Sequence, residues 1–314
     1  MEIIRYLLSV ICCNETKRST VLPKKSKITT LDILVLLTLL VGLTYVIYQV
    51  KVKLNYNWQW GIIPQYLFRY DAESGKWVSN YLIHGLMTTL RLSFWGTLLA
   101  TILGTVMGLL RVSKSLFHRM IARSYVELMR NLPPLVIIFI FYFFISDQIM
   151  PIIGIDDFLR SSSPGTQRLF EVLFSPPQFA SAFIAALFTL AIFEGAYITE
   201  IVRAGIESVE KGQWEASHAL GLSKYHNMRH IILPQAMQRL LPALAGQFIS
   251  LIKDSAIVSV ISIQELSYQG TQLMASTYLT IEIWITITAL YLVMTLTFSL
   301  GVGKLEAYMA RSQA

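Results

Sequence analysis

The chain alternates between long apolar runs and short polar segments. Six of the runs are long enough to cross a bilayer, which takes about 20 residues of helix. The pattern predicts an all-α integral membrane protein with about six transmembrane helices and without a soluble domain. The predicted spans are residues 31–50, 81–110, 125–147, 179–204, 237–262 and 277–303.

The polar segments between the spans differ in their residue composition. The run Asn131–Pro134 ends in two prolines, which should kink or restart the third helix. Residues 151–177 are rich in Ser and Pro and indicate an outward loop. The segment Asn55–Trp77 is rich in Trp and Tyr, which favours an interfacial aromatic belt. A docking surface is the alternative for this aromatic segment.

Composition supports the membrane assignment. Of the 314 residues, 54% are hydrophobic and only 14% are charged, against about a quarter charged in a soluble domain. The net charge of +7 does not indicate a nucleic-acid partner, because the basic residues are not clustered with stacking aromatics. Cys12 and Cys13 are adjacent, so we expect free thiols rather than a structural disulfide.

The distribution of Lys and Arg predicts the orientation. With both termini placed in the cytoplasm, 17 of the 26 basic residues fall on the cytoplasmic side. Loops on that side carry the Lys/Arg excess in membrane proteins. The sequence therefore predicts a multi-pass protein with both ends inside the cell.

The fourth and fifth predicted spans are separated by a polar segment, residues 207–234. A short helix around Glu215 should end at Gly221, which suits the left-handed position after a helix. Ser223 can cap a second short helix, which we expect to end at Pro234. The segment therefore predicts two short helices joined at a glycine, a compact cytoplasmic projection that could fit a groove on another protein.

The residues of this projection resemble the EAA motif of ABC importer permeases. The family pattern is E-A-A, three residues, G, nine residues and I-x-L-P, and the chain departs from it only at Ser217. In that family the loop is the coupling helix, which fits a cleft on the ATP-binding subunit. The resemblance assigns this role to Gly212, Trp214, Glu215, Ala216, Ser217, Gly221, Leu233 and Pro234. For Trp214, the alternative is an interfacial anchor.

Flanking stretches are similar to the polar amino-acid branch of these permeases, namely Ala196–Ile206, Lys211–Trp214 and Pro242–Ile261. The resemblance covers about residues 80–305. It implies the type I importer permease fold, with a five-helix core in residues 81–305, an added N-terminal region 1–80 with an anchor helix, and a cytoplasmic tail 306–314.

The same resemblance implies a bacterial inner-membrane importer of several subunits. Two permease subunits, identical or related, would form the pathway in the lipid bilayer, and a periplasmic binding protein would deliver a polar amino acid. ATP and Mg²⁺ would bind the dimer of ATP-binding subunits. This chain has no G-x-x-x-x-G-K-[ST] pattern, so we expect it to bind no nucleotide or other cofactor and to be no enzyme.

Charged residues inside the predicted spans are candidates for the substrate pathway. A charge near the bilayer centre costs about 2.5–3.5 kcal/mol on insertion scales, so it normally faces protein or water. A zwitterionic amino acid needs a cation for its carboxylate and an anion for its ammonium. The candidates are Arg91, Glu194, Tyr197, Lys253 and Asp254.

For the four charged candidates, the alternative is that they pair with one another and fix helix packing. Lys253 and Asp254 are adjacent, so we expect them to have different partners. Glu200 and Arg203 are three residues apart, which predicts a structural ion pair near the cytoplasmic end. Gly104 and Gly108 form a GxxxG pattern, which predicts close helix packing within the permease or across a permease dimer.

Other classes of protein are less compatible with the sequence. A secondary transporter driven by an ion gradient would typically show internal repeats, which are not evident, and would leave the coupling motif unexplained. A membrane enzyme would need a nucleophile–base or metal set in the spans. His226 and His230 are four residues apart but have no third ligand in a zinc pattern, so no metal site is predicted. The transported amino acid and the identity of the second permease subunit remain open.

Overall fold

The computed structural model describes residues 30–53, 56–73 and 75–311, and Cys12 and Cys13 lie outside these ranges. Residue contacts divide the chain into two units, Met1–Trp58 and Gln59–Ala314. Residues 59–80, which the sequence suggested grouping with the N-terminal region, are thus in contact with the permease core. Each unit is described by itself.

The first unit contains one described helix, α2 (Thr30–Lys53). Its apolar side chains, such as Leu36 and Leu39, are more than half exposed, as expected for a surface that faces lipid. The described apolar part, Ile33–Tyr45, is shorter than a bilayer span, so the predicted anchor helix stays a prediction.

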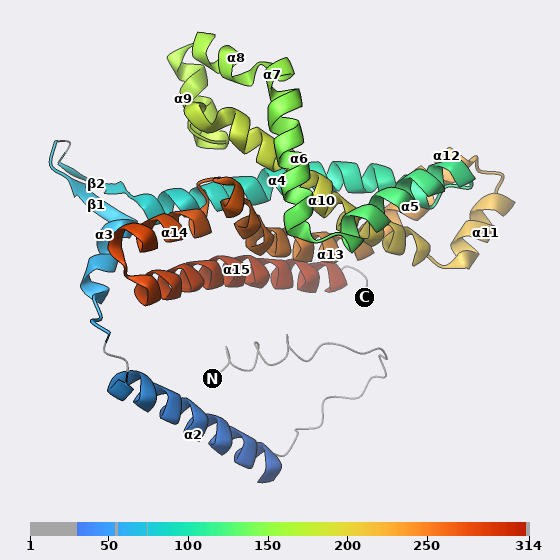
Figure 1. The fold of residues 1–314 in the computed structure, drawn as a ribbon. Coiled ribbons are helices and arrows are strands. Elements are labelled where there is room, and N and C mark those ends of the chain that lie inside the picture. Colours follow the sequence, from blue (N-terminus) through green and yellow to red (C-terminus); the bar gives the residue numbers. More distant parts are fainter. Residues whose placement is uncertain (1–29, 54–55, 74, 312–314) are drawn as a thin grey trace. The chain divides into compact units, whose positions relative to one another are not determined.

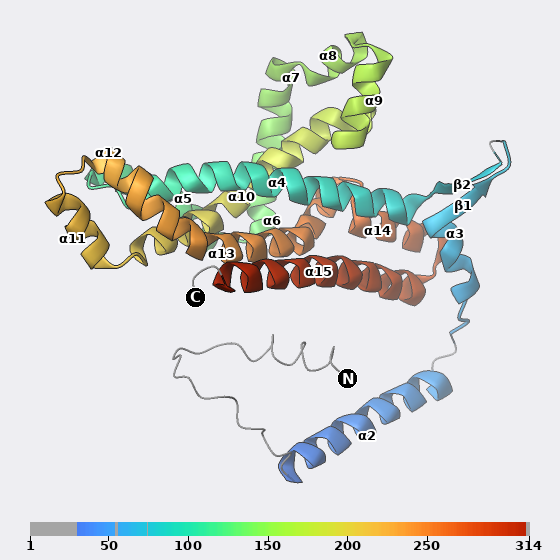
Figure 2. The ribbon, with the colours of Figure 1, turned by 180° about the vertical axis from the view of Figure 1, so that it is seen from behind.

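The second unit contains five helical segments that are long and apolar enough to cross a membrane. This agrees with a helical membrane protein that has a five-helix core. In Figures 1 and 2, the helices α4, α13 (Leu233–Asp254) and α15 (Thr280–Arg311) run in similar directions, with α13 packed against both of the others, and α6 (Pro134–Phe144) is steeply inclined to α4. The spans are Tyr81–Arg111 (α4), Pro134–Ile153, Pro177–Glu207, Lys224–Ile261 and Thr280–Lys304.

The third predicted span begins later than the sequence indicated. Residues 125–131 belong to a separate helix, α5 (Leu116–Asn131), which ends before Pro133. The span itself starts at Pro134, because two successive prolines cannot donate backbone hydrogen bonds within a helix but fit its first turn. It runs through α6 (Pro134–Phe144), a π-helical turn η2 (Ile145–Ile149) and α7 (Met150–Ile153).

The segments expected to be outward loops are partly ordered into short elements. Residues 151–177 contain α8 (Ile155–Ser161) and α9 (Pro164–Leu173), whose first turn is capped by Ser163. The aromatic segment forms an antiparallel hairpin, an addition to the helical fold, in which Tyr70 lies opposite Trp77. The aromatic segment contains η1 (Trp60–Ile62) and α3 (Ile63–Leu67), followed by the two strands of the hairpin, β1 (Phe68–Asp71) and β2 (Lys76–Ser79).

The second half of the core contains the remaining helices. The last two, α14 and α15, meet at Tyr278, which has φ +60°. Their bounds are η3 (Pro177–Phe179), α10 (Ala180–Glu207), α11 (Lys211–Ala219), α12 (Lys224–Asn227), the π-helical turn η4 (Met228–Ile232), α13 (Leu233–Asp254), η5 (Ser255–Ile261), α14 (Leu266–Thr277) and α15 (Thr280–Arg311).

Close packing of α4 on α10 organises the core. A Cβ at Gly104 would lie 2.6 Å from Cγ2 of Ile198, and one at Gly108 would lie 2.6 Å from Cγ1 of Val202. The GxxxG pattern therefore serves packing within this chain. Because both helices are held so closely, residues at either end of α4 have fixed positions relative to α10.

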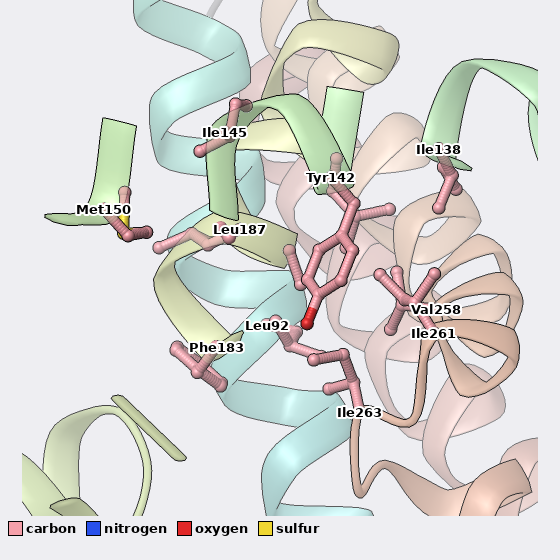
Figure 3. Packing of buried hydrophobic residues seen from close by; sticks show 13 residues of the cluster. Leu92, Ile138, Tyr142, Ile145, Met150, Phe183, Leu187, Val258, Ile261 and Ile263 are labelled. Carbon is pink, nitrogen blue, oxygen red and sulfur yellow. The ribbon is translucent and has the colours of Figure 1, made fainter. Parts of the chain in front are cut away.

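An apolar cluster lies between α4, α6, α10 and η5. Figure 3 shows the ring of Tyr142 reaching from α6 toward Leu92 on α4, with Val258 and Ile261 beside it. We call the cluster the apolar layer. Its buried members are Leu92, Ile138, Tyr142, Ile145, Met150, Phe183, Ala185, Ala186, Leu187, Leu190, Val258, Ile261 and Ile263.

Candidate functional site

The segment between α10 and α13 forms the coupling loop predicted from the sequence, with α11 followed by a turn and α12. Gly221 has φ +71°, the left-handed conformation that glycine adopts without a Cβ penalty. The N–H of Gly221 donates to the carbonyl of His218, and that of Leu222 donates to Ser217. Ser223 accepts from the N–H of His226 and so caps α12.

The second helix of the loop does not end at Pro234, and that expectation is wrong. The chain stays helical from Lys224 to Ile261, and Pro234 lies in the first turn of α13. The wider π-helical turn η4 immediately precedes it. Such a turn relieves the clash that a proline ring makes with the carbonyl four residues earlier, so the helix continues.

Three contacts attach the loop to the membrane helices. Trp214 is half-buried and packs on the cluster that contains Val209 and Ile232, which favours a role as an anchor of the loop on its own protein. Arg239 donates to the carbonyl of Ser208. Gln235 donates to Gln213 Oε1 at 3.2 Å. The loop is therefore fixed to the end of α10 and the start of α13.

The solvent-exposed surface of the coupling loop carries large apolar side chains. Leu220 is 77% exposed and Tyr225 is 70% exposed. The other predicted coupling residues differ in position: Glu215, Ala216, Gly212, Gly221 and Pro234 are exposed, Leu233 is half-buried and Ser217 is buried. Leu220 and Tyr225 were not singled out from the sequence. Large apolar residues within four positions of a helix-ending glycine, in a polar segment, are the signal that could have found them.

A cavity of about 440 Å³ lies between α10, α13 and the start of α6. We call it the central cavity. It brings together four of the five predicted pathway residues, Glu194, Tyr197, Lys253 and Asp254. The fifth, Arg91, lines a different cavity. Lys253 and Asp254 line the same cavity, and the expectation that they have different partners stays a prediction.

Glu194 is the most buried charged group of this cavity, with 1% of its surface exposed. Its Oε2 accepts a hydrogen bond of 2.5 Å from Gln247 Nε2. Its Oε1 is buried and has no hydrogen-bond partner in the described part of the chain. A buried acceptor without a partner costs about 1–3 kcal/mol, so the cavity is suited to a ligand that brings a donor.

A cation lies close to the central cavity without lining it, namely Arg130. Tyr197 lines the cavity, and the guanidinium of Arg130 lies 5.5 Å from the centre of its ring, a cation–π distance. Among the residues that the structure describes, Arg91, Glu194, Lys253 and Asp254 form no ion pair with one another. Mutual pairing therefore does not explain these charges.

An ion network lies between the central cavity and the coupling loop. Arg203 Nε donates to Glu200 at 2.9 Å, and Arg111 Nε lies 2.9 Å from Glu200 Oε1. Glu207 is a further partner of Arg203. The sequence indicated only Glu200 and Arg203, because Arg111 comes from the end of α4, far away in sequence.

The described residues contain no group of three or more His, Cys, Asp or Glu side chains placed to hold a metal ion. His226 and His230 stack with ring centroids 5.5 Å apart on the exposed side of the loop.

Residues 96–311 match the family model of the binding-protein-dependent transport system inner membrane component. The chain belongs to this family. The family predicted from the EAA motif is thereby confirmed, and the protein is a multi-pass inner membrane component. The match runs from the middle of α4 to the end of α15 and so contains both the coupling loop and the residues that line the central cavity.

Curated relatives and solved structures agree with this permease assignment. The chain is 32% identical to the probable glutamine ABC transporter permease protein GlnM of Bacillus subtilis (strain 168), over 70% of this chain and 92% of the relative. It is 33% identical to the glutamine transport system permease protein GlnP of Escherichia coli (strain K12), over 73% and 92%.

Two solved structures share the fold. A chain of an amino acid ABC transporter, crystallised with histidines, is 35% identical and superposes with a TM-score of 0.58, over 73% of this permease and 94% of that chain. A chain of the MetNI methionine ABC transporter, in an inward-facing conformation, is 17% identical with a TM-score of 0.57, over 73% and 96%. The second likeness shows the fold alone.

Proposed function

We propose that this permease forms the translocation pathway of an ATP-driven importer for polar amino acids. The curated relatives are named as glutamine permeases, which supports this substrate class. A periplasmic binding protein would deliver the amino acid, and two ATP-binding subunits with ATP and Mg²⁺ would drive transport. The second permease subunit is another copy or a related chain.

The observation that carries the proposal is the continuous helix between loop and cavity. The segment Lys224–Ile261 starts within the coupling loop and includes Gln247, Ser250, Lys253 and Asp254, which line the central cavity. A movement imposed on the loop is transmitted along this helix. In alternating access, ATP binding would move the loop, and the same helix would change the exposure of the cavity.

The loop is suited to a partner groove by its exposed side chains. Burying the apolar surface of an exposed side chain in an interface contributes about 25 cal/mol of favourable free energy per Å². Leu220 and Tyr225 would supply this apolar contact, and Glu215 would supply a charge at the edge. In the cavity, Glu194 would accept from the ammonium of the amino acid and Lys253 would face its carboxylate.

The test is reconstitution of the complete importer in liposomes with its binding protein and ATP-binding subunits. We expect ATP-dependent uptake of one or a few members of a panel of amino acids. Glu215→Lys and Leu220→Asp should each reduce uptake at least about tenfold and weaken attachment of the ATPase, with the permease still inserted. Uptake that persists without ATP or the ATPase would contradict the proposal and favour an ion-gradient transporter.

A further inference from the structure

A second polar cavity lies at the other end of α4 from the coupling loop. Its volume of about 550 Å³ falls in the range of small-molecule sites, about 300–1,000 Å³. It is lined by the first turns of α4, by residues 168–179 and by the segment after η5. The orientation rule for basic residues places this end outside, so we call it the outer cavity.

Arg91 is the feature of this cavity that needs a partner. It lies in the membrane span α4, is only partly exposed and lines the cavity. In the described part of the chain it forms no hydrogen bond or ion pair. Glu171 is the opposite charge that acts on it, yet the two make no salt bridge within the described residues. A lone cation in a span is costly, and a carboxylate is the ligand that matches a guanidinium.

The other lining groups fit the rest of an amino acid. Arg168 adds a second cation, and Glu171 provides an anion for an ammonium. The amides of Gln264 and Gln269 can donate and accept. Phe183 supplies an apolar wall. Cation, anion and amides around one space of this size match a zwitterion with a polar side chain.

We propose that the outer cavity binds a free amino acid, with Arg91 holding its α-carboxylate, as a second site before the central cavity. This inference rests on the proposed function. The two cavities have no lining residue in common. The apolar layer lies between them: Phe183 and Ile263 face the outer cavity, and Ile257, packed on the layer, faces the central one. An amino acid could therefore occupy each cavity independently.

The experiment measures binding of radiolabelled L-glutamine, or of the amino acid selected by the uptake panel, to the importer in nanodiscs without the binding protein. We expect two bound molecules per permease chain. In Arg91→Gln, the outer site should lose at least about tenfold in affinity. The corresponding α-amide, which lacks the carboxylate charge, should bind wild type and Arg91→Gln equally at this site.

Arg69→Gln is the matched control, because Arg69 is exposed on β1 and lines neither cavity. It should bind as wild type does. If Arg91→Gln fails to fold, Arg168→Gln and Glu171→Gln test the same cavity through exposed side chains. Each should lower affinity a few-fold at the outer site only.

Three results would overturn the second site. One is a single bound molecule per wild-type permease; another is wild-type affinity in all three cavity variants. The third is weaker docking of the binding protein in Arg91→Gln with unchanged binding of the free amino acid, which would assign Arg91 to a carboxylate of that protein. Uptake by the wild-type importer separates these results from failure of the proposed function.

Discussion

The coupling loop and the central cavity depart from the usual distribution of polarity in opposite directions. The loop lies in the most polar part of the core and exposes Leu220 and Tyr225. The cavity lies among the spans and holds Glu194, Lys253 and Asp254. Each arrangement is unfavourable for an isolated chain. The difference teaches that each region is completed by a different kind of partner, an apolar groove for the loop and a charged ligand for the cavity.

We expect the largest effect from a substitution in the coupling loop that changes its shape. Gly221→Val places a β-branched residue at φ +71°, where a left-handed conformation costs about 1–2 kcal/mol. The turn should change shape, so ATP-dependent uptake and attachment of the ATPase should fall by about tenfold or more. Pull-down of the ATPase and liposome uptake measure both. Gly221→Asn, which tolerates this conformation, should keep most of the activity.

Gly154→Val is the matched control for that change. Gly154 has φ +65° and, like Gly221, no atom within 4 Å of an added Cβ, but it lies between α7 and α8 on the outer side. We expect normal attachment of the ATPase in this variant. Equal loss of attachment in both variants would mean that the effect is general strain and not the shape of the coupling loop.

The intermediate effect concerns the cavity side. Glu194→Ala removes the buried carboxylate and leaves Gln247 without its partner. Because a hydrogen bond to a charged group contributes about 1.5–3 kcal/mol, kcat/KM for uptake should fall about 10–100-fold, with assembly retained on size-exclusion chromatography. Glu127→Ala removes an exposed carboxylate of α5 and should leave uptake unchanged. Normal kinetics in Glu194→Ala would remove this residue from the pathway.

We expect the smallest effect from Glu265, a carboxylate that is buried outside the spans and can be compared with Glu194 inside them. The effect is on the pH dependence of stability. Burial raises the pKa of Glu265 to about 7, although hydrogen bonds from Tyr291, Thr89 and the N–H of Tyr268 lower it in part. The folded protein then holds a proton that the unfolded chain releases above about pH 4.5. Stability from this group is present below that pH, is lost as the pH rises toward 7, and is constant above it.

Thermal unfolding of the purified importer measures this dependence. We expect a Tm that is a few degrees lower at pH 8 than at pH 5, at about 2–4 °C for each kcal/mol. Glu265→Gln, which cannot ionise, should reduce the difference between the two pH values. The exposed Glu73 is the control site, and Glu73→Gln should keep the wild-type difference. A pH dependence that is the same in wild type and Glu265→Gln would contradict the argument.

The sequence predicted those features that depend on neighbouring residues. The left-handed turn at Gly221 and the cap at Ser223 follow from local chemistry, and three of the five spans were placed within a few residues of their helices. The span predicted to start at residue 237 belongs to a helical segment that already begins at Lys224. The third predicted span started too early, at residue 125, because hydropathy alone does not separate the amphipathic helix α5 from the apolar helix α6. The predicted restart of the helix at Pro133 and Pro134 is confirmed, since α6 begins at Pro134.

The cavities could not be predicted in this way, because they are made by residues that are distant in sequence. Glu194 and Gln247 are 53 residues apart, and no local pattern joins them. Arg91 had the same signal as Glu194, a charge within a span, yet α4 places it in the outer cavity. The continuation of the helix through Pro234 depends on the π-helical turn η4 before it, a feature of backbone geometry that composition does not encode.

The same long helix contains Pro242, five residues before Gln247. A proline inside a helix removes one backbone hydrogen bond and lowers the resistance to bending. From Tyr225 to Asp254 such a helix measures about 44 Å at 1.5 Å per residue, so a tilt of a few degrees at the cytoplasmic tip displaces the far end by several ångströms. The position at which the helix bends determines how much of this displacement reaches Lys253 and Asp254. We expect the bend at Pro242.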